Sequence, residues 1–202
     1  MKVIVVGATG TLGKAVVEDL NKRHEVVEVG FSGGDVQVDI TDPSSIRAMY
    51  EEIGAFDALV SATGDVHFGP LEDITQEQWL LGLNNKLMGQ INLVMEGAKR
   101  VNDNGSFTLT SGIISKDPIR YGAAATTVCS AIEGFAASAA LELPRGIRIN
   151  VVSPTILEES VELFGAAFVG FEPVPAAKAA LAFSKSVDGA RSGQTFEVKG
   201  HT

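Results

Sequence analysis

The chain has 202 residues, a length that suits a single domain with a full hydrophobic core. Its 16 basic and 25 acidic residues give a formal net charge of −9 without any basic run, which argues against a nucleic-acid surface. The single cysteine, Cys129, excludes an internal disulfide and a metal site built from several thiols. We expect a cytoplasmic protein, because the first residues lead directly into a strand and no uninterrupted apolar run has membrane-spanning length.

The chain opens with a strand, a glycine turn and a helix. The strand is Val3–Val6, the turn is Gly7-Ala8-Thr9-Gly10-Thr11-Leu12-Gly13, and the helix covers about 12–22. Small residues let the backbone approach a pyrophosphate, and the N–H groups and dipole of a helix N-terminus favour negative charge. The predicted ligand is a dinucleotide such as NAD or NADP. The alternative is a structural turn in another kind of α/β protein.

The rest of the chain alternates between strands and helices. Apolar runs predict strands over 25–29, 36–38, 57–62, 106–110, 147–152 and 194–198. Helices are predicted over 43–53, 75–101, 124–143, 158–164 and 175–185, the first two with helix-start signals at Asp42-Pro43 and at Thr75-Gln76-Glu77-Gln78. This order predicts an α/β fold of the Rossmann type, a doubly wound parallel sheet with helices on both faces, in one domain over 1–200. His201 and Thr202 are either native or a remnant of an expression tag.

Ligands of such sheets bind at the carboxyl ends of the strands, beside the reversal of strand order. The glycine turn and these strand ends supply the expected cofactor contacts, which are Gly7, Thr9, Gly10, Thr11, Leu12, Gly13, Gly30, Phe31, Ser32, Asp39, Ile40, Ala62, Thr63, Gly64 and Pro154. No carboxylate follows the second strand to repel a 2′-phosphate, and no arginine does either, so NADP is expected in preference to NAD. We expect no metal site, because His67 has no second ligand at suitable spacing.

This arrangement resembles the short-chain dehydrogenase/reductase family over essentially the whole chain. The matching segments are the Gly7, Gly10, Gly13 triplet, Asp39, Ser61–Gly64, Gly105–Gly112, Glu133–Phe135, Ala140–Leu143, Gly146–Pro154 and Gly193–Val198. The resemblance implies that Asp39 meets the adenine amino group and that the long helices form the interface of a homodimer or homotetramer. It also implies a catalytic tyrosine that exchanges a proton with the substrate oxygen, a lysine four residues later that lowers the tyrosine pKa, and a serine that holds that oxygen.

The chain departs from the family at the tyrosine and lysine, where Ala125 and Cys129 stand instead. The serine position falls on Ser111, which either holds the substrate oxygen or is a strand-end hydroxyl that caps a turn. Lys86 takes the place of an asparagine that the family carries in the preceding helix, and we expect its ammonium to replace the cation missing at Cys129. The alternative is a surface lysine. Tyr121 either acts as a substitute acid or is a loop aromatic that lines the pocket or an interface.

The predicted function is NAD(P)-dependent oxidation or reduction of a small alcohol or carbonyl compound, with Ser111, Lys86 and Tyr121 as the candidate catalytic residues. Water or Tyr121 would supply the proton. Losing a positioned acid or base typically costs about 10²–10⁴ in rate, so such an enzyme would be slow without being inert. The alternative is a non-catalytic NAD(P)-binding sensor or interaction protein on the same fold.

Overall fold

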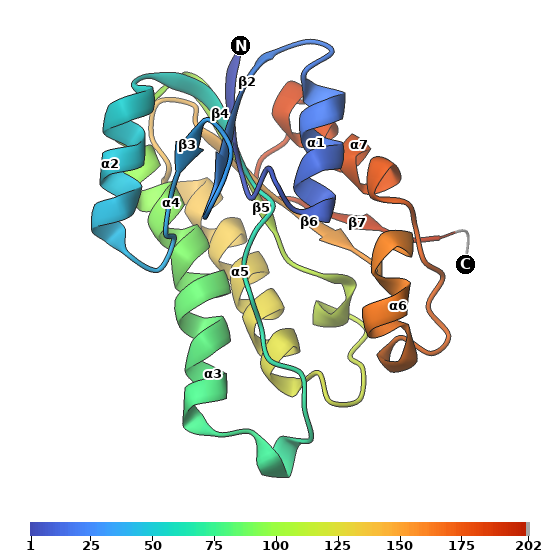
Figure 1. Ribbon diagram of the computed structural model, residues 1–202. Coiled ribbons are helices and arrows are strands. Elements are labelled where there is room, and N and C mark those ends of the chain that lie inside the picture. Colours follow the sequence, from blue (N-terminus) through green and yellow to red (C-terminus); the bar gives the residue numbers. More distant parts are fainter. Residues whose placement is uncertain (201–202) are drawn as a thin grey trace.

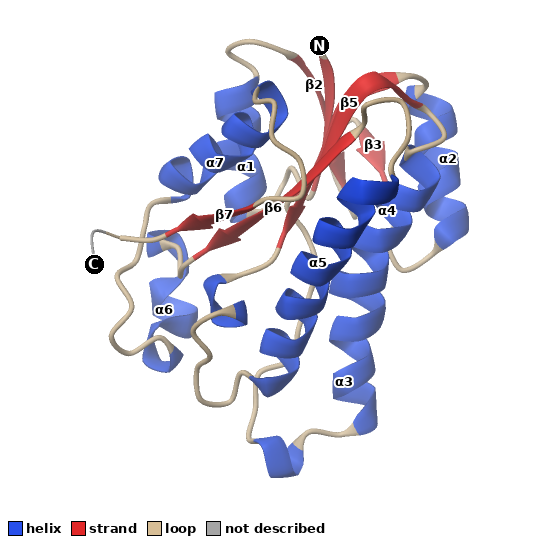
Figure 2. Ribbon diagram, turned by 180° about the vertical axis from the view of Figure 1, so that it is seen from behind, coloured by secondary structure: helices blue, strands red, loops and turns tan. Residues whose placement is uncertain are grey.

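A computed structural model describes residues 1–200 and shows one parallel sheet between two layers of helices (Figures 1 and 2). The sheet has seven strands in the order β3-β2-β1-β4-β5-β6-β7. Their bounds are β1 (Lys2–Val6), β2 (Glu25–Gly30), β3 (Val36–Gln37), β4 (Phe56–Ser61), β5 (Val101–Thr110), β6 (Arg148–Pro154) and β7 (Thr195–Val198). The strand order reverses between β1 and β4, so the ligand crevice of this fold class lies beyond their carboxyl ends. His201 and Thr202 lie outside the described residues.

Helices cover both faces of the sheet (Figure 1). On one face lie α1 (Thr11–Leu20) and α7 (Ala176–Asp188), and on the other lie α2 (Pro43–Ile53), α4 (Gly89–Gly97) and α5 (Ala123–Glu142). The remaining helices are α3 (Gln76–Gly82), the π-helical turn η2 (Leu83–Met88) that joins it to α4, and α6 (Val161–Phe164). Short 3₁₀ turns are η1 (Leu71–Asp73), η3 (Ile113–Ser115), η4 (Glu158–Ser160) and η5 (Gly165–Ala167).

The apolar run of β1 shows why the strands are apolar at every position instead of alternating between apolar and polar residues. Ile4 and Val6 belong to the core cluster under α2, α4 and α5, whereas Val3 and Val5 belong to the cluster under α1 and α7. All four side chains are at most 1% exposed. A strand buried on both faces needs apolar residues at every position, and this confirms the predicted doubly covered sheet.

Two helix starts follow the predicted capping chemistry. At α2, the Asp42 side chain accepts a hydrogen bond from the Ser44 N–H and Pro43 occupies the first turn. At α3, the Thr75 hydroxyl accepts from the Gln78 N–H, and the Gln78 side chain accepts from the Thr75 N–H. This is a complete capping box, and it fixes where the long helical segment begins.

The predicted helix over 158–164 is the 3₁₀ turn η4 followed by the short α6. The structure differs from the predicted elements in two further places. First, β5 begins at Val101 rather than at 106, because residues 102–105 form a bulge in the strand between the Phe56–Val101 and Ala58–Ser106 pairs. Second, the predicted helix over 75–101 is divided into α3, η2 and α4. The spacing of apolar residues reflects the average geometry of the whole helical segment. It therefore does not reveal a single turn with a different helical geometry.

By length and composition, α5 is the one helix among residues 1–200 that could cross a membrane. Within the fold it packs against β6 and η3, and its Ala125, Cys129 and Ile132 side chains are at most 2% exposed. A core helix of an α/β protein passes the same test of length and apolarity.

Candidate functional site

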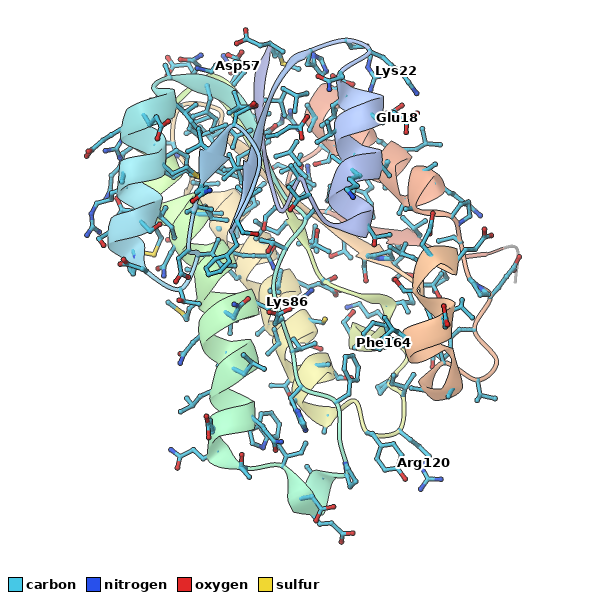
Figure 3. All side chains as sticks on the ribbon, viewed as in Figure 1. Glu18, Lys22, Asp57, Lys86, Arg120 and Phe164 are labelled. Atoms are coloured by element: carbon cyan, nitrogen blue, oxygen red, sulfur yellow. The ribbon has the colours of Figure 1, made fainter. Side chains whose placement is uncertain are left out.

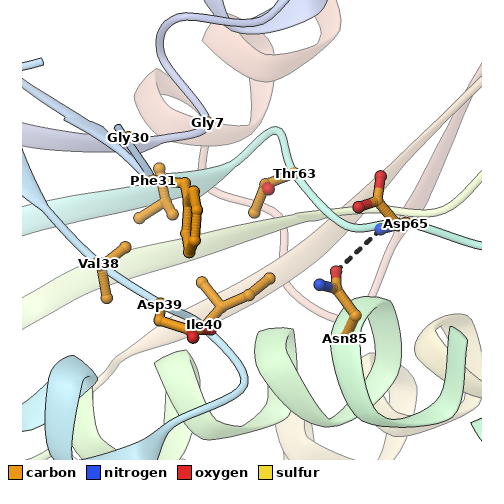
Figure 4. A pocket seen from close by; sticks show the side chains of 10 residues that line it. Gly7, Gly30, Phe31, Val38, Asp39, Ile40, Thr63, Asp65 and Asn85 are labelled. Carbon is orange, nitrogen blue, oxygen red and sulfur yellow. Dashed lines mark hydrogen bonds between the residues drawn. The ribbon is translucent and has the colours of Figure 1, made fainter. Parts of the chain in front are cut away.

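Two adjoining cavities lie at the carboxyl ends of β1, β2 and β4. The strand-end pocket, about 290 Å³, is lined by Val6, Gly7, Gly30, Phe31, Val38, Asp39, Ile40, Thr63, Asp65 and Asn85 (Figure 4). The glycine-turn pocket, about 380 Å³, is lined by Gly7, Thr9, Gly10, Leu12, Phe31, Ala62, Thr63, Gly64, Asp65, Lys86 and Thr110. They share Gly7, Phe31, Thr63 and Asp65 and so form one elongated site. Its location is the crevice that the strand order predicts.

The glycine turn is shaped for close approach of the backbone. A Cβ atom at Gly13 would lie 1.9 Å from the Gly7 carbonyl oxygen, and one at Gly7 would lie 2.5 Å from the Ala62 carbonyl oxygen. Gly7 also has a φ of +84°, a conformation that favours glycine. Helix α1 begins after Gly10 without a side-chain cap, so its first N–H groups stay available to an anion. These features fit the diphosphate of a dinucleotide.

The strand-end pocket offers an aromatic face and a fixed carboxylate. The Phe31 side chain is 76% exposed and projects from the end of β2 across the pocket (Figure 4). The Asp39 carboxylate accepts hydrogen bonds from the Thr41 N–H at 2.9 Å and from the Thr41 hydroxyl at 2.7 Å. Asn85 accepts from the Asp65 N–H at 2.9 Å and thereby ties the loop after β4 to the π-helical turn. A flat base could stack against Phe31 here.

Lys86 enters the glycine-turn pocket from η2 and is half-buried (Figure 3). Its side chain crosses directly over Gly64, where a Cβ atom would lie 2.6 Å from the lysine Cγ, and Gly64 has a φ of +118°. Burial raises the pKa of the Cys129 thiol, and the positive charge of Lys86 opposes that rise. The Lys86 charge is therefore near enough to Cys129 to affect its thiol. This proximity is what we expect if the Lys86 ammonium replaces the cation missing at position 129.

The position of Ser111 does not match its predicted role of holding the substrate oxygen. It is 4% exposed and does not line either pocket. Its hydroxyl donates to Glu133 at 2.9 Å, and the same carboxylate accepts from the Ser115 hydroxyl and pairs with Lys116 at 3.1 Å. A hydroxyl has one proton to donate, so Ser111 in this arrangement is not available to polarise a substrate carbonyl.

Tyr121 also lies apart from both pockets. Its side chain is 51% exposed and lies beneath the guanidinium of Arg120, 5.3 Å from the ring centre. Its φ of +63° is set in a loop where its carbonyl accepts from the Gly69 N–H. The structure therefore does not bring Tyr121 to Lys86, and the predicted role as a substitute acid has no geometric basis.

Most of the predicted cofactor contacts line the two pockets. Four do not, namely Thr11, Gly13, Ser32 and Pro154. Gly13 still matters, because its missing side chain lets α1 approach the turn. The sequence interpretation missed Asp65, Asn85 and Thr110, which adjoin predicted positions along the chain and could have been found from the strand ends. Among residues 1–200, no group of His, Cys, Asp and Glu could hold a metal ion.

Comparison with known proteins finds a family model and relatives that are described as reductases or oxidoreductases. A family model described as enoyl-(acyl carrier protein) reductase matches residues 1–182. An uncharacterized oxidoreductase of Methylorubrum extorquens is 25% identical over 175 residues, which cover 75% of this chain and 71% of that protein. The 3-oxoacyl-[acyl-carrier-protein] reductase FabG of Escherichia coli is 24% identical over 177 residues, covering 77% and 72%.

Solved structures share the whole architecture. The protein lin1944 of Listeria innocua is 54% identical, with a TM-score of 0.96 and coverage of 98% of this chain and 99% of that one. A small-chain dehydrogenase crystallised in complex with NADPH is 24% identical, with a TM-score of 0.89 and coverage of 98% and 96%. This second likeness concerns the fold.

Proposed function

The chain belongs to the short-chain dehydrogenase/reductase family, and from that premise we propose that it is an NAD(P)-dependent oxidoreductase acting on a small carbonyl or alcohol. The observation that carries the proposal is the glycine-turn pocket of about 380 Å³ beside the uncapped N-terminus of α1, where Gly7 and Gly13 allow the backbone packing that shapes a site for a diphosphate. The proposal places the protein in the cytoplasm.

We propose NADP as the preferred cofactor. Residues 30–34, which end β2 and begin the following loop, carry no carboxylate to repel a 2′-phosphate. Phe31 would stack on the adenine, and Asp39, held by Thr41, would meet its amino group. The small-chain dehydrogenase with NADPH bound supports this choice only through its shared fold.

The proposed chemistry rests on Lys86. The bound nicotinamide supplies or accepts the hydride. The Lys86 ammonium, in the glycine-turn pocket beside Gly64, donates a hydrogen bond to the substrate oxygen and stabilises the negative charge that develops there. Because Ser111 bonds to Glu133 and Tyr121 lies apart, the proton comes from water that enters the open pocket.

A second candidate function is cofactor binding without turnover. Ala125 and Cys129 lie in a small apolar cluster with Ile113 and Ile114, where an acid and its lysine would otherwise act. This composition favours a sensor or interaction protein that reads the NADP pool.

We also propose that the protein forms a homodimer or homotetramer through α4 and α5. A groove of about 230 Å³ runs between them, lined by Val94, Met95, Ala98, Phe135, Ser138, Ala139, Glu142 and Leu143. Met95 is 58% exposed in the single chain, so association would cover an apolar side chain.

Binding calorimetry with NADP, NADPH, NAD and NADH tests the proposal, followed by a screen of carbonyl compounds for NADPH oxidation. We expect binding of at least one cofactor, and loss of that binding in Gly13→Ala, since the new Cβ would collide with Gly7. Gly134→Ala is the matched control, because a Cβ there meets nothing within 4 Å. Turnover supports the enzyme, tight binding without turnover supports the sensor, and no binding contradicts both.

A further inference from the structure

The helix that carries Lys86 is interrupted by one π-helical turn. The N–H of Gly89 reaches back five residues to the carbonyl of Asn84, and also to that of Asn85. Such turns change the rotational setting of the side chains they contain and occur often at functional sites. Both Asn85 and Lys86, which line the site, come from this turn. Its conformation therefore decides where the Lys86 ammonium lies.

Gln90, one residue after Gly89, is the polar group that holds this turn. It is 0% exposed, and its side-chain amide uses both ends. The Nε2 group donates to the Lys86 carbonyl at 3.1 Å and to the Thr110 carbonyl at 2.9 Å. The Oε1 atom accepts from the Thr110 N–H at 2.9 Å. One side chain thus bonds the backbone of two residues that line the glycine-turn pocket.

The sheet gives a reason for these bonds. The ladder between β4 and β5 ends at the Val60–Thr108 pair, two residues before β5 ends. Thr110 therefore has no partner residue on β4 for its N–H and C=O, and the Gln90 amide takes that place. Leaving a buried N–H or C=O group without a hydrogen-bond partner destabilises the fold, so the amide is strongly held.

We propose that Gln90 is a positioning residue that fixes the Lys86 turn against the end of β5. The backbone of Lys86 is thus joined to that of Thr110, 24 residues further along the chain, by one amide, and within residues 1–200 no other side chain bonds both. The catalytic meaning of this role rests on the proposed function, because it assumes that Lys86 acts on the substrate oxygen. The positioning itself does not depend on a cofactor.

Cys129 reports on the position of Lys86 within the intact protein. It is the only cysteine, so [3-¹³C]cysteine labelling gives one resonance whose chemical shift follows thiol ionisation. Lys86 lowers the pKa of this thiol, whereas Glu133 raises it. A displaced Lys86 therefore raises the pKa of Cys129, even when nothing is bound.

The experiment titrates the Cys129 resonance in wild type, Lys86→Met, Gln90→Met and Gln76→Met. Gln76→Met is the matched control, since the same change is made at the exposed first residue of α3. We expect Lys86→Met and Gln90→Met to raise the pKa of Cys129 in the same direction, and Gln76→Met to leave it unchanged. If Gln90→Met does not fold, Gln90→Asn replaces it, because its shorter amide adds no charge near Cys129 and cannot reach both the Lys86 carbonyl and Thr110.

The inference is overturned if a folded Gln90 variant keeps the wild-type pKa of Cys129, or if Lys86→Met does not move it. In a second measurement, Gln90→Met should weaken NADPH binding about tenfold, as expected for about 1.4 kcal/mol of lost interaction. Wild type that binds no cofactor would contradict the proposed function, while the Cys129 titration would still decide the positioning role.

Discussion

At the scale of single residues, the glycine-turn pocket carries a positive charge on Lys86. Position 129 holds a buried thiol, and the charge that acts on it comes from Lys86 on a different helix. A lysine at 129 would bring a charge into the apolar cluster of Ile113, Ile114 and Ala125, whereas Lys86 reaches the site through an open pocket. The desolvation cost of the ammonium is correspondingly smaller.

The replacement Lys86→Met tests this arrangement. We expect kcat for carbonyl reduction to fall about 100-fold, a typical loss when one preorganised electrostatic contact to a developing oxyanion is removed. Lys86→Arg keeps the charge and should retain part of the activity. Lys99→Met, on an exposed lysine paired with Glu96, is the control. Equal turnover by the Lys86 and Lys99 variants would rule out the catalytic role.

Residue roles could be predicted from the sequence where the backbone alone decides them. The glycine turn and the strand ends supplied most of the pocket-lining residues, because tight turns and parallel strands constrain where those residues lie. The setting of Ser111 could not be predicted, because it depends on a distant carboxylate, Glu133. The role of Gln90 was not predicted for the same reason, since no residue near it in the chain indicates that its side chain bonds to Thr110.

At the scale of elements, a polar network joins the two helices on one face of the sheet. The Asp19 carboxylate of α1 accepts from the Ser184 hydroxyl of α7 at 2.5 Å and from Arg23 at 3.3 Å. Arg23 in turn donates to Ser184 and pairs with Asp188. The hydrogen bond from Ser184 is the main cause that lowers the pKa of Asp19 below its ordinary value of 3.8.

This network predicts a dependence of stability on pH. Because the pKa of Asp19 is lower in the folded state, its contribution is complete above the unfolded pKa and is lost as pH falls through the folded pKa. Asp19→Asn should reduce the free energy of unfolding by about 1–3 kcal/mol at neutral pH, with a smaller difference from wild type in acid. Urea unfolding at neutral and acidic pH measures this.

The control for that measurement is Asp73→Asn, in the exposed turn η1. It makes the same chemical change away from α1 and α7. A difference between Asp19→Asn and wild type that stays constant from neutral to acidic pH would contradict the linkage.

Element boundaries were predictable where a local signal marks them. Asp42-Pro43 and the Thr75–Gln78 capping box fixed two helix starts. The π-helical turn was not predictable, since its stability comes from the Gln90 amide and from contacts with the end of β5. The bulge at the start of β5 likewise depends on pairing with β4.

At the scale of the whole molecule, apolar strands alternating with helices were sufficient to predict the doubly wound sheet. The seven predicted apolar runs correspond to the seven strands, and right-handed crossovers place helices on both faces because the strand order reverses between β1 and β4. Assembly and substrate depend on surfaces that this alternation does not describe.

The proposed assembly makes a further prediction. Met95→Glu places a charge in the groove between α4 and α5 and should convert the oligomer to a monomer, because burying an unpaired carboxylate is costly. Leu71→Glu, at a residue 68% exposed in η1, should leave the assembly intact. Analytical ultracentrifugation measures both, with circular dichroism to confirm folding. An unchanged mass for Met95→Glu would move the interface elsewhere.

The strand order has a consequence for synthesis on the ribosome. After β4 pairs with β1, the strands β5, β6 and β7 each add to the same growing edge, in the order in which they leave the exit tunnel. No later strand has to insert between two that are already paired. Each newly released segment therefore meets a finished template, and the nascent chain can extend its sheet one strand at a time without undoing earlier pairing.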